Sequence, residues 1–268
     1  MTAMKRGGLN EYNQYSNEDQ RRRAARLRAG ASIGDGAGAK GNEMTTAIIG
    51  IGNLGAIVAR QLASGGEPVV LSATSQAKTK KLAAEFGGAA SAALNNRDAI
   101  QRADNVLFAL WLSSMREVIG EVGDLLPGKL VIDPSNPVSV AADGTITRTL
   151  PEDQSSGEVV ASWLPQGTRF VKAFGSVAAT MLASNAFRKP QHAVLFYATD
   201  DAKAATEVER LIRIAGFDPA RAGGVAKAGR IEVGGDLHPY GGLNGRLVDR
   251  DEASLLVTPA ERTSVVAN

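Results

Sequence analysis

A chain of 268 residues with 44% hydrophobic content is long enough to form one large or two small packed domains. It has no cysteine and two histidines, which excludes disulfides and thiolate metal ligands, and we expect no metal site. The formal net charge is +2, and no apolar run approaches the roughly 18 residues that a membrane span requires, so we expect a cytoplasmic protein with no membrane partner.

The positive charge is concentrated in the first 43 residues. They carry eight basic and five acidic side chains, a net charge of +3, which leaves −1 for the rest of the chain. Their many Gly, Asn, Gln and Arg residues predict a flexible basic N-terminal extension. The segment RRRAARLR within it is compatible with a contact to nucleic acid or to an anionic surface, but we favour a solvated extension and expect no nucleic-acid partner.

From residue 44 onward, apolar runs alternate with amphipathic ones. The runs that predict buried strands are AIIG, PVVLS, NVLFALW (residues 105–111), KLVID, RFVKAF and HAVLFYA. Helical spacing of apolar residues follows them in LGAIVARQLAS, QAKTKKLAAEF and DAKAATEVERLIRIAG. Strands that alternate with helices predict an α/β fold with a doubly wound, mostly parallel sheet. Residues 134–157 are rich in Asp, Ser, Thr and Pro and predict a long irregular connection.

The first strand is followed by the glycine pattern G-x-G-x-x-G, formed by Gly50, Gly52 and Gly55. In this pattern the first glycine permits a tight turn, the second lets the backbone approach a pyrophosphate, and the third lets the helix pack against the strand. The amides of Asn53, Leu54 and Gly55 would then begin the helix, whose positive dipole end favours phosphate. A strand before and a helix after are the context that the motif requires, so we predict a dinucleotide cradle. The alternative is a strand–turn–helix with no ligand.

The end of the second predicted strand indicates which dinucleotide binds. NAD enzymes usually place an acidic residue there to bind the ribose hydroxyl, and the segment LSATSQ holds no acid. Ser72, Thr74 and Ser75 can hydrogen-bond a 2′-phosphate, and Lys78 can supply charge, so we predict NADP(H). The alternative is that these hydroxyls cap the next helix.

Ligands of open α/β sheets bind beyond the carboxyl ends of the strands. That rule adds candidate cofactor-binding residues after the strands that end near residues 110 and 133, which are Leu110, Trp111, Asn136 and Pro137. Trp111 is a candidate wall for the nicotinamide or a core residue, and Asn136 is a candidate donor to the carboxamide or a turn residue.

A glycine-rich segment, GGDLHPYGGLNG at residues 234–245, predicts a substrate loop, or alternatively an ordinary exposed loop. Candidate substrate-binding residues are Phe174, Gly175, Tyr240 and Gly242. No Ser-His-Asp set or telling carboxylate pair is present, and His238 is the one candidate proton donor, for a carbonyl or imine acceptor. Transfer of hydride between two cofactor rings does not need such a residue, because the protein mainly positions the rings.

Four segments resemble the NADPH:coenzyme F-420 oxidoreductase family in sequence and in order. They are AIIGIGNLGAIVARQLASGGEPVVLSA, PGKLVIDPSNPV, ASWLPQGTRFVKAF and AGFDPARAG, and the resemblance spans roughly residues 44–250. It implies a Rossmann domain with a small C-terminal extension, NADPH as hydride donor, and coenzyme F-420 or a flavin as acceptor. The chain departs from the family pattern at Ala73, where Arg is frequent, at Trp111, where Pro is frequent, and at Gly175, where Asn is frequent.

These observations predict four segments: the extension at residues 1–43, an NADP-binding Rossmann domain at 44–190, a C-terminal α/β extension with the substrate loop at 191–250, and a frayed tail at 251–268. The expected activity is hydride transfer between NADP(H) and a deazaflavin or flavin, whose partner is a small-molecule redox acceptor. Two alternatives stay open, a reductase of a small imine or carbonyl and a non-catalytic NADPH-binding regulator. A homodimer is compatible with the sequence. The sequence does not identify the hydride acceptor.

Overall fold

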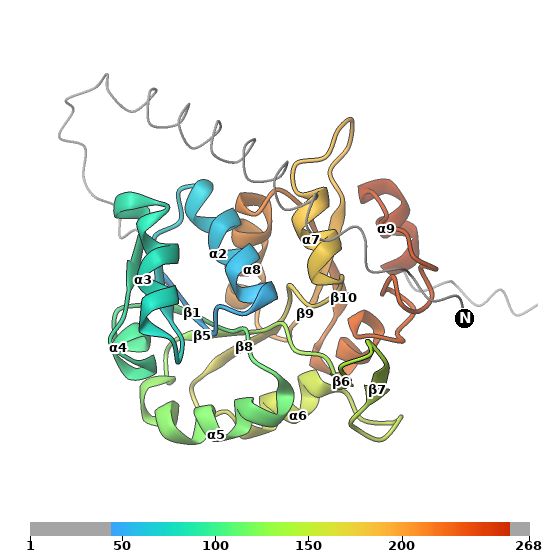
Figure 1. Cartoon of the computed structure of the whole chain (residues 1–268). Coiled ribbons are helices and arrows are strands. Elements are labelled where there is room, and N and C mark those ends of the chain that lie inside the picture. Colours follow the sequence, from blue (N-terminus) through green and yellow to red (C-terminus); the bar gives the residue numbers. More distant parts are fainter. Residues whose placement is uncertain (1–43, 258–268) are drawn as a thin grey trace, which may run out of the picture.

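The computed structural model describes residues 44–257 (Figure 1). The extension predicted at residues 1–43 and the chain end at residues 258–268 lie outside the described residues. The strands are β1 Thr46–Ile49, β2 Val69–Ser72, β3 Ala90–Ala92, β4 Asn105–Phe108, β5 Leu130–Asp133, β6 Val138–Val140, β7 Ile146–Arg148, β8 Arg169–Lys172, β9 Val194–Ala198 and β10 Asp218–Gly223. The α-helices are α2 Asn53–Ser64, α3 Gln76–Ala84, α4 Asn96–Gln101, α5 Leu112–Val122, α6 Ser156–Trp163, α7 Ala179–Asn185, α8 Ala202–Ile214 and α9 Arg250–Val257. Short 3-10 helices are η1 Gly87–Ala89, η2 Gly123–Leu125 and η3 Val225–Ile231.

Eight strands form one sheet in the order β10-β9-β8-β5-β4-β1-β2-β3. The pairs from β3 across to β8 are all parallel. β9 meets β8 in antiparallel fashion through the residue pair Lys172–Ala198, and β10 runs parallel to β9. The chain winds outward from β1 first to one side and then to the other, which is the Rossmann-type order with its switch point between β1 and β4. The predicted fold class is therefore confirmed.

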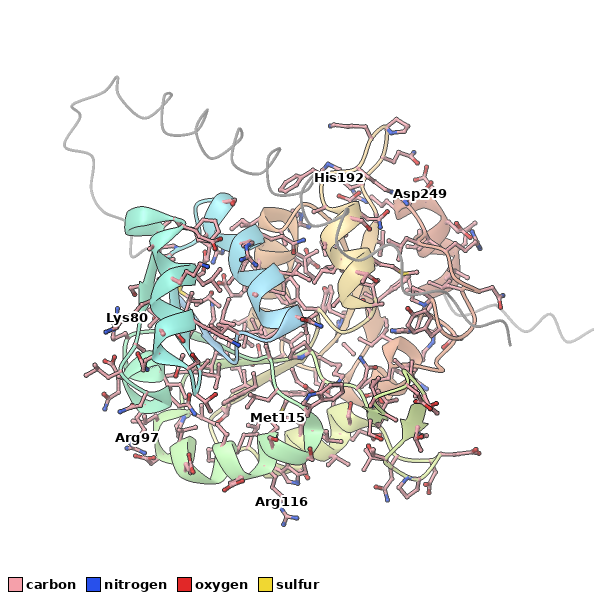
Figure 2. All side chains as sticks on the ribbon, viewed as in Figure 1. Lys80, Arg97, Met115, Arg116, His192 and Asp249 are labelled. Atoms are coloured by element: carbon pink, nitrogen blue, oxygen red, sulfur yellow. The ribbon has the colours of Figure 1, made fainter. Side chains whose placement is uncertain are left out.

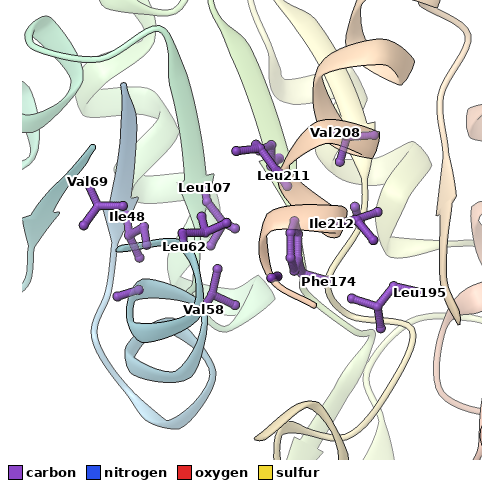
Figure 3. Close-up of a cluster of buried hydrophobic side chains, with 14 of the residues drawn as sticks. Ile48, Val58, Leu62, Val69, Leu107, Phe174, Leu195, Val208, Leu211 and Ile212 are labelled. Atoms are coloured by element: carbon purple, nitrogen blue, oxygen red, sulfur yellow. The ribbon is translucent and has the colours of Figure 1, made fainter. Parts of the chain in front are cut away.

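Helices cover both faces of the sheet (Figure 1). Residues of α2, α7 and α8 form one hydrophobic cluster with the strands, and residues of α4, α5 and α6 form a second cluster on the opposite face. Figure 3 shows the first cluster, in which Val58 and Leu62 of α2 lie near Ile48 and Leu107, and Leu211 of α8 lies near Phe174. Burial of an aliphatic side chain stabilises the fold by about 1.5–3 kcal/mol, so these two layers hold the sheet rigid below its carboxyl edge.

Capping side chains precede several helices, and the helices have a buried face and an exposed face. Ser75, Asn95 and Ser155 each precede a helix and accept a hydrogen bond from a backbone amide of its first turn. On α5, the neighbouring residues Met115 and Arg116 point toward the sheet and away from it, respectively (Figure 2). No helix within residues 44–257 is long and apolar enough to cross a membrane.

The structure corrects three sequence expectations about the elements. The strand predicted at residues 105–111 ends at Phe108, and Leu112 already begins α5. The connection predicted to be irregular at residues 134–157 contains the antiparallel hairpin β6–β7. The frayed tail predicted from residue 251 is wrong for residues 251–257, because they belong to α9, whose Ala253 is buried in a cluster with β9 and β10. β9 and β10 also continue the main sheet, so residues 191–250 are joined to it through backbone pairing.

Candidate cofactor-binding and acceptor site

Two of the three motif glycines are required by the protein itself. Gly50 has φ +94°, and a Cβ there would lie 2.5 Å from the carbonyl oxygen of Ala109. A Cβ on Gly55 would collide with the carbonyl oxygen of Gly50 and lie 2.9 Å from the Cβ of Ala109. Gly50 therefore makes the turn and Gly55 lets α2 pack against β1 and β4, as the motif predicts.

Gly52 is different, because nothing in the protein requires a glycine there. It is exposed, its φ is −65°, and no protein atom lies within 4 Å of the position that its Cβ would take. It precedes α2, whose first hydrogen bond runs from the amide of Ala56 to the carbonyl of Gly52 at 3.0 Å. The amides of residues 53–55 come before that bond and carry no intrahelical partner. The space around Gly52 and these amides fit a bound phosphate, which is the arrangement that a dinucleotide cradle needs.

The end of β2 differs in part from the expectation. The side chain of Ser72 is 1% exposed, and its hydroxyl donates to Oδ1 of Asn96 at 2.7 Å, so it does not face a ligand. Ser75 accepts from the amide of Lys78 at 3.4 Å and caps α3, which is the alternative that the sequence left open. Thr74 and Lys78 are exposed beside this turn and remain candidates for a 2′-phosphate. Asn96 was not predicted, and no local sequence signal marks it.

The chain after β4 borders the glycine turn. The Cδ2 atom of Leu110 lies 3.0 Å from the position that a Cβ on Gly50 would take, so Leu110 lies directly beside the turn. Trp111 follows with extended φ and ψ of −65° and 145°, immediately before α5, and is 57% exposed. Its exposure excludes the alternative that Trp111 is a core residue.

The residues predicted after β5 and β8 are mostly used inside the protein. Asn136 donates from Nδ2 to the carbonyl of Gly175 at 3.0 Å and accepts at Oδ1 from the amide of Val233 at 2.7 Å. Pro137 is buried. Phe174 is 0% exposed and belongs to the core cluster under α8, so the expectation that it binds substrate is wrong (Figure 3).

Gly175 is also a packing residue. It is buried, and a Cβ on it would collide with the carbonyl oxygen of Pro134. The segments that follow β5 and β8 therefore touch backbone to backbone, which only glycine allows. This contact gives a physical reason for glycine at Gly175 and does not support its predicted role in substrate binding.

A buried charged cluster, which the sequence analysis missed, lies beneath these segments. Nζ of Lys172 is 2.7 Å from Oδ2 of Asp133, 2.7 Å from Oγ of Ser156 and 3.6 Å from Oε1 of Glu232. The carboxylate of Glu232 accepts hydrogen bonds from the amides of Ser156 and Gly157, at the start of α6. The three charged side chains are at most 2% exposed. These contacts join β5, β8, α6 and the end of η3. Separating the elements would leave buried charges unpaired, which is energetically costly.

The glycine-rich loop at residues 234–245 is folded on itself. His238 is 1% exposed, and its Nδ1 accepts from the amide of Tyr240 at 2.9 Å. Burial lowers the pKa of His238 to about 4, so the imidazole is neutral near pH 7. A buried neutral imidazole is a poor general acid, and the weak assignment of His238 as proton donor is not supported.

The glycines of this loop serve its packing. A Cβ on Gly242 would lie 2.5 Å from the carbonyl oxygen of Asp236, and a Cβ on Gly241 would collide with that of Gly235. Tyr240 is 50% exposed, and its ring lies 5.6 Å from that of His238. Gly242 thus supports the loop, whereas Tyr240 stays available for a ligand. Within the described residues, no group of three or more His, Asp and Glu side chains is arranged to hold a metal ion.

Comparisons with known proteins agree with the geometry of the glycine turn. A family model described as NADP oxidoreductase, coenzyme F420-dependent, matches residues 45–137. The F420-dependent NADP reductase of Methanothermobacter marburgensis is 28% identical over 141 residues, which are 50% of this chain and 63% of that relative. This chain thus matches less than two thirds of the length of that curated relative.

Two solved structures share the architecture. The hypothetical protein SMa0349 from Sinorhizobium meliloti superposes with a TM-score of 0.66 at 27% identity, covering 78% of this chain and 96% of that one. A candidate F420-dependent NADP reductase from Arthrobacter sp. FB24 gives a TM-score of 0.60 at 22% identity, covering 69% and 87% of the two chains, and shows the same fold. Over residues 45–137, the chain is therefore similar to the coenzyme F420-dependent NADP oxidoreductases.

Proposed function

We propose that this protein is an NADPH-dependent oxidoreductase that transfers hydride between NADP(H) and the ring of a deazaflavin or flavin. The observation that carries the proposal is Gly52, an exposed glycine that neither backbone strain nor packing explains. A pyrophosphate seated against Gly52 and the first amides of α2 supplies the reason for that glycine.

Recognition of the phosphorylated dinucleotide rests on charge at the end of β2. Residues 72–76 contain no acid, Thr74 among them is exposed, and so is Lys78, two residues further on. A carboxylate at this turn would repel a 2′-phosphate, whereas a lysine and a hydroxyl can bind it. The geometry therefore favours NADPH over NADH, although the arginine frequent in the family is replaced by Ala73.

Hydride transfer between two cofactor rings does not require a side chain that acts as an acid or base. NADPH held at the first amides of α2 would supply two electrons and one proton as hydride to the acceptor ring, and the second proton would come from water. The protein holds the phosphates at α2, keeps Leu110 beside the turn, and presents the carboxyl ends of β4 and β5 to the second ring. A carbonyl or imine acceptor would require a proton donor, and the buried, neutral His238 does not favour that alternative.

The test is anaerobic oxidation of NADPH by the full chain, followed through the loss of reduced-nicotinamide absorbance. Coenzyme F420, FMN, FAD and no acceptor are compared in parallel, with NADH as control donor. We expect turnover with one of the ring acceptors and a clear preference for NADPH. Tight NADPH binding without turnover on any of these rings would contradict the proposal and favour a non-catalytic NADPH-binding protein.

A further inference from the structure

The turns after β2 and β3 are joined at the carboxyl edge of the sheet. They are residues 72–76 and residues 93–96, and they lead into α3 and α4 on opposite faces of the sheet (Figure 1). At one end of the first turn, the hydroxyl of Ser72 donates to Oδ1 of Asn96 at 2.7 Å. At its other end, Nε2 of Gln76 donates to two carbonyls of the second turn, at 3.1 and 2.9 Å. The two turns therefore form one surface, the β2–β3 rim.

The β2–β3 rim is continuous with the glycine turn. The amide of Gly50 donates to the carbonyl of Ser72 at 2.8 Å, so Ser72 contacts the glycine turn with its backbone and Asn96 with its side chain. Thr74 is exposed between the two contacts that join the rim. A dinucleotide whose pyrophosphate lies at the glycine turn places its adenosine ribose at the end of β2. A 2′-phosphate on that ribose would therefore lie at the rim, within reach of residues from both turns.

Asn96 presents hydrogen-bond donors at this rim. The residue is half-buried, and its side-chain oxygen is held by Ser72, which is 1% exposed. Within residues 44–257, Nδ2 of Asn96 has no protein acceptor, and an amide nitrogen carries two N–H donors. Because the planar carboxamide is fixed through its oxygen, the direction of these donors is set before a ligand binds. Such preorganisation lowers the entropic cost of binding.

The charges around Asn96 are compatible with an anion. The first turn of α4 contains one acid, Asp98, whose carboxylate accepts from the amide of Leu94 at 2.8 Å and pairs with Arg102 at 3.4 Å. These contacts compensate the charge of Asp98 within the protein. On the other side of the rim, α3 carries the exposed Lys78, which supplies positive charge.

We propose that Nδ2 of Asn96 donates a hydrogen bond to the 2′-phosphate of NADP(H), and that Ser72 is the positioning residue that fixes the Asn96 carboxamide. This inference rests on the proposed function and names a specificity residue from the turn after β3. Hydrogen bonds to a charged oxygen are stronger than those between neutral groups. One such bond, made to NADPH and not to NADH, gives a preference of about tenfold or more.

The experiment measures the binding of adenosine 2′-monophosphate and adenosine 5′-monophosphate to the full chain by calorimetric titration, which requires no hydride transfer. Asn96→Asp keeps an oxygen for Ser72 and replaces the donors by a carboxylate. We expect it to raise the dissociation constant of the 2′-monophosphate about tenfold or more, and that of the 5′-monophosphate less than about twofold. The ratio of the dissociation constants of NADH and NADPH should fall by the same factor as the 2′-monophosphate affinity.

Asn95→Asp is the matched control for added charge. Asn95 is exposed, and its Oδ1 caps α4 by accepting from the amide of Asp98 at 2.9 Å, which a carboxylate oxygen can also do. We expect this variant to change the affinity for either fragment by less than about threefold, because water and salt screen an exposed charge. Equal effects of the two variants, or an equal loss of both fragments in Asn96→Asp, would overturn the assignment.

The role of Ser72 is tested by a double-mutant cycle. Ser72→Ala releases the carboxamide of Asn96, so it should weaken the 2′-monophosphate in the unsubstituted background and have no further effect on it in Asn96→Ala. Additive losses would refute the positioning role. A direct signature is available by NMR, because the side-chain amide resonances of Asn96 should shift with the 2′-monophosphate and not with the 5′-monophosphate.

The outcomes separate this inference from the proposed function. If the 2′-phosphate preference depends on Asn96 but no ring acceptor is reduced by NADPH, the proposed function fails and the Asn96 site stands. If a ring acceptor is reduced and Asn96→Asp leaves the preference for NADPH unchanged, the proposed function stands and the Asn96 site fails.

Discussion

Replacing Gly52 by alanine tests the cofactor cradle more directly than any other change. At this position a methyl group meets no protein atom within 4 Å, and φ of −65° is allowed for alanine. Alanine is a weaker residue than glycine before a helix, by at most about 1 kcal/mol. For a domain of this size that loss lowers the melting temperature by about 2–4 °C.

The effect on binding should be far larger. The methyl group would occupy the space where a phosphate must approach the first amides of α2. Each hydrogen bond from an amide to a charged group contributes about 1.5–3 kcal/mol. Losing two of them costs about 3–6 kcal/mol, which raises the dissociation constant of NADPH by roughly 100- to 20,000-fold.

The assay is calorimetric titration of NADPH together with a thermal melt. Gly120→Ala is the matched control, because Gly120 is exposed in α5 and a Cβ there also meets no atom within 4 Å. Gly55→Ala is the opposite control, since its Cβ collides with Gly50 and should unfold the turn. If Gly52→Ala is folded and binds NADPH as tightly as Gly120→Ala, the phosphate does not lie at Gly52 and the reasoning fails.

Three further predictions concern charge. Lys78→Ala should reduce the preference for NADPH over NADH about tenfold in binding assays, whereas Lys80→Ala on the same helix should leave it unchanged; equal effects would show that the 2′-phosphate lies elsewhere. Because burial lowers the pKa of His238 from its ordinary 6.5 to about 4, the unfolded chain binds a proton first as pH falls, so stability should drop by about 3 kcal/mol between pH 6.5 and 4. His238→Asn should flatten that part of the unfolding profile and keep the turnover rate, and loss of turnover would restore the histidine as a candidate acid. Lys172→Met leaves two buried carboxylates without their cation, so it should cost about 3–5 kcal/mol and lower the melting temperature by roughly 6–20 °C; an unchanged melt would show that the cluster is not essential.

The conformation of the glycine turn could be predicted from the sequence because its information is local. Three glycines within six residues sit between a strand and a helix, and each function of the motif depends on its immediate neighbours. The end of β2 was harder to predict. A serine at the end of a strand can face a ligand, cap a helix or bond a neighbouring loop, and only the fold shows that Ser72 turns inward to Asn96.

The close packing of the glycine-rich loop could not be predicted, for a different reason. Glycines are needed both for mobility and for close backbone packing, and composition does not separate the two. In this loop Gly241 and Gly242 pack against neighbouring backbone, and His238 is buried as part of that packing. Of the residues predicted to bind substrate in this loop, the half-exposed Tyr240 remains a candidate.

The buried charged cluster could not be predicted because segments distant in sequence assemble it. Asp133, Lys172 and Glu232 meet in one buried cluster, and no periodicity or spacing along the chain brings them together. That cluster holds the ends of β5 and β8 in place. The hairpin and Asn136 follow β5, and Asn136 bonds Gly175 after β8 and Val233 after η3. The family model ends at residue 137, before the hairpin, Lys172 and Glu232. The match to the family model therefore supports the proposed donor more than the proposed acceptor, because it includes the glycine turn and ends before β8 and the glycine-rich loop.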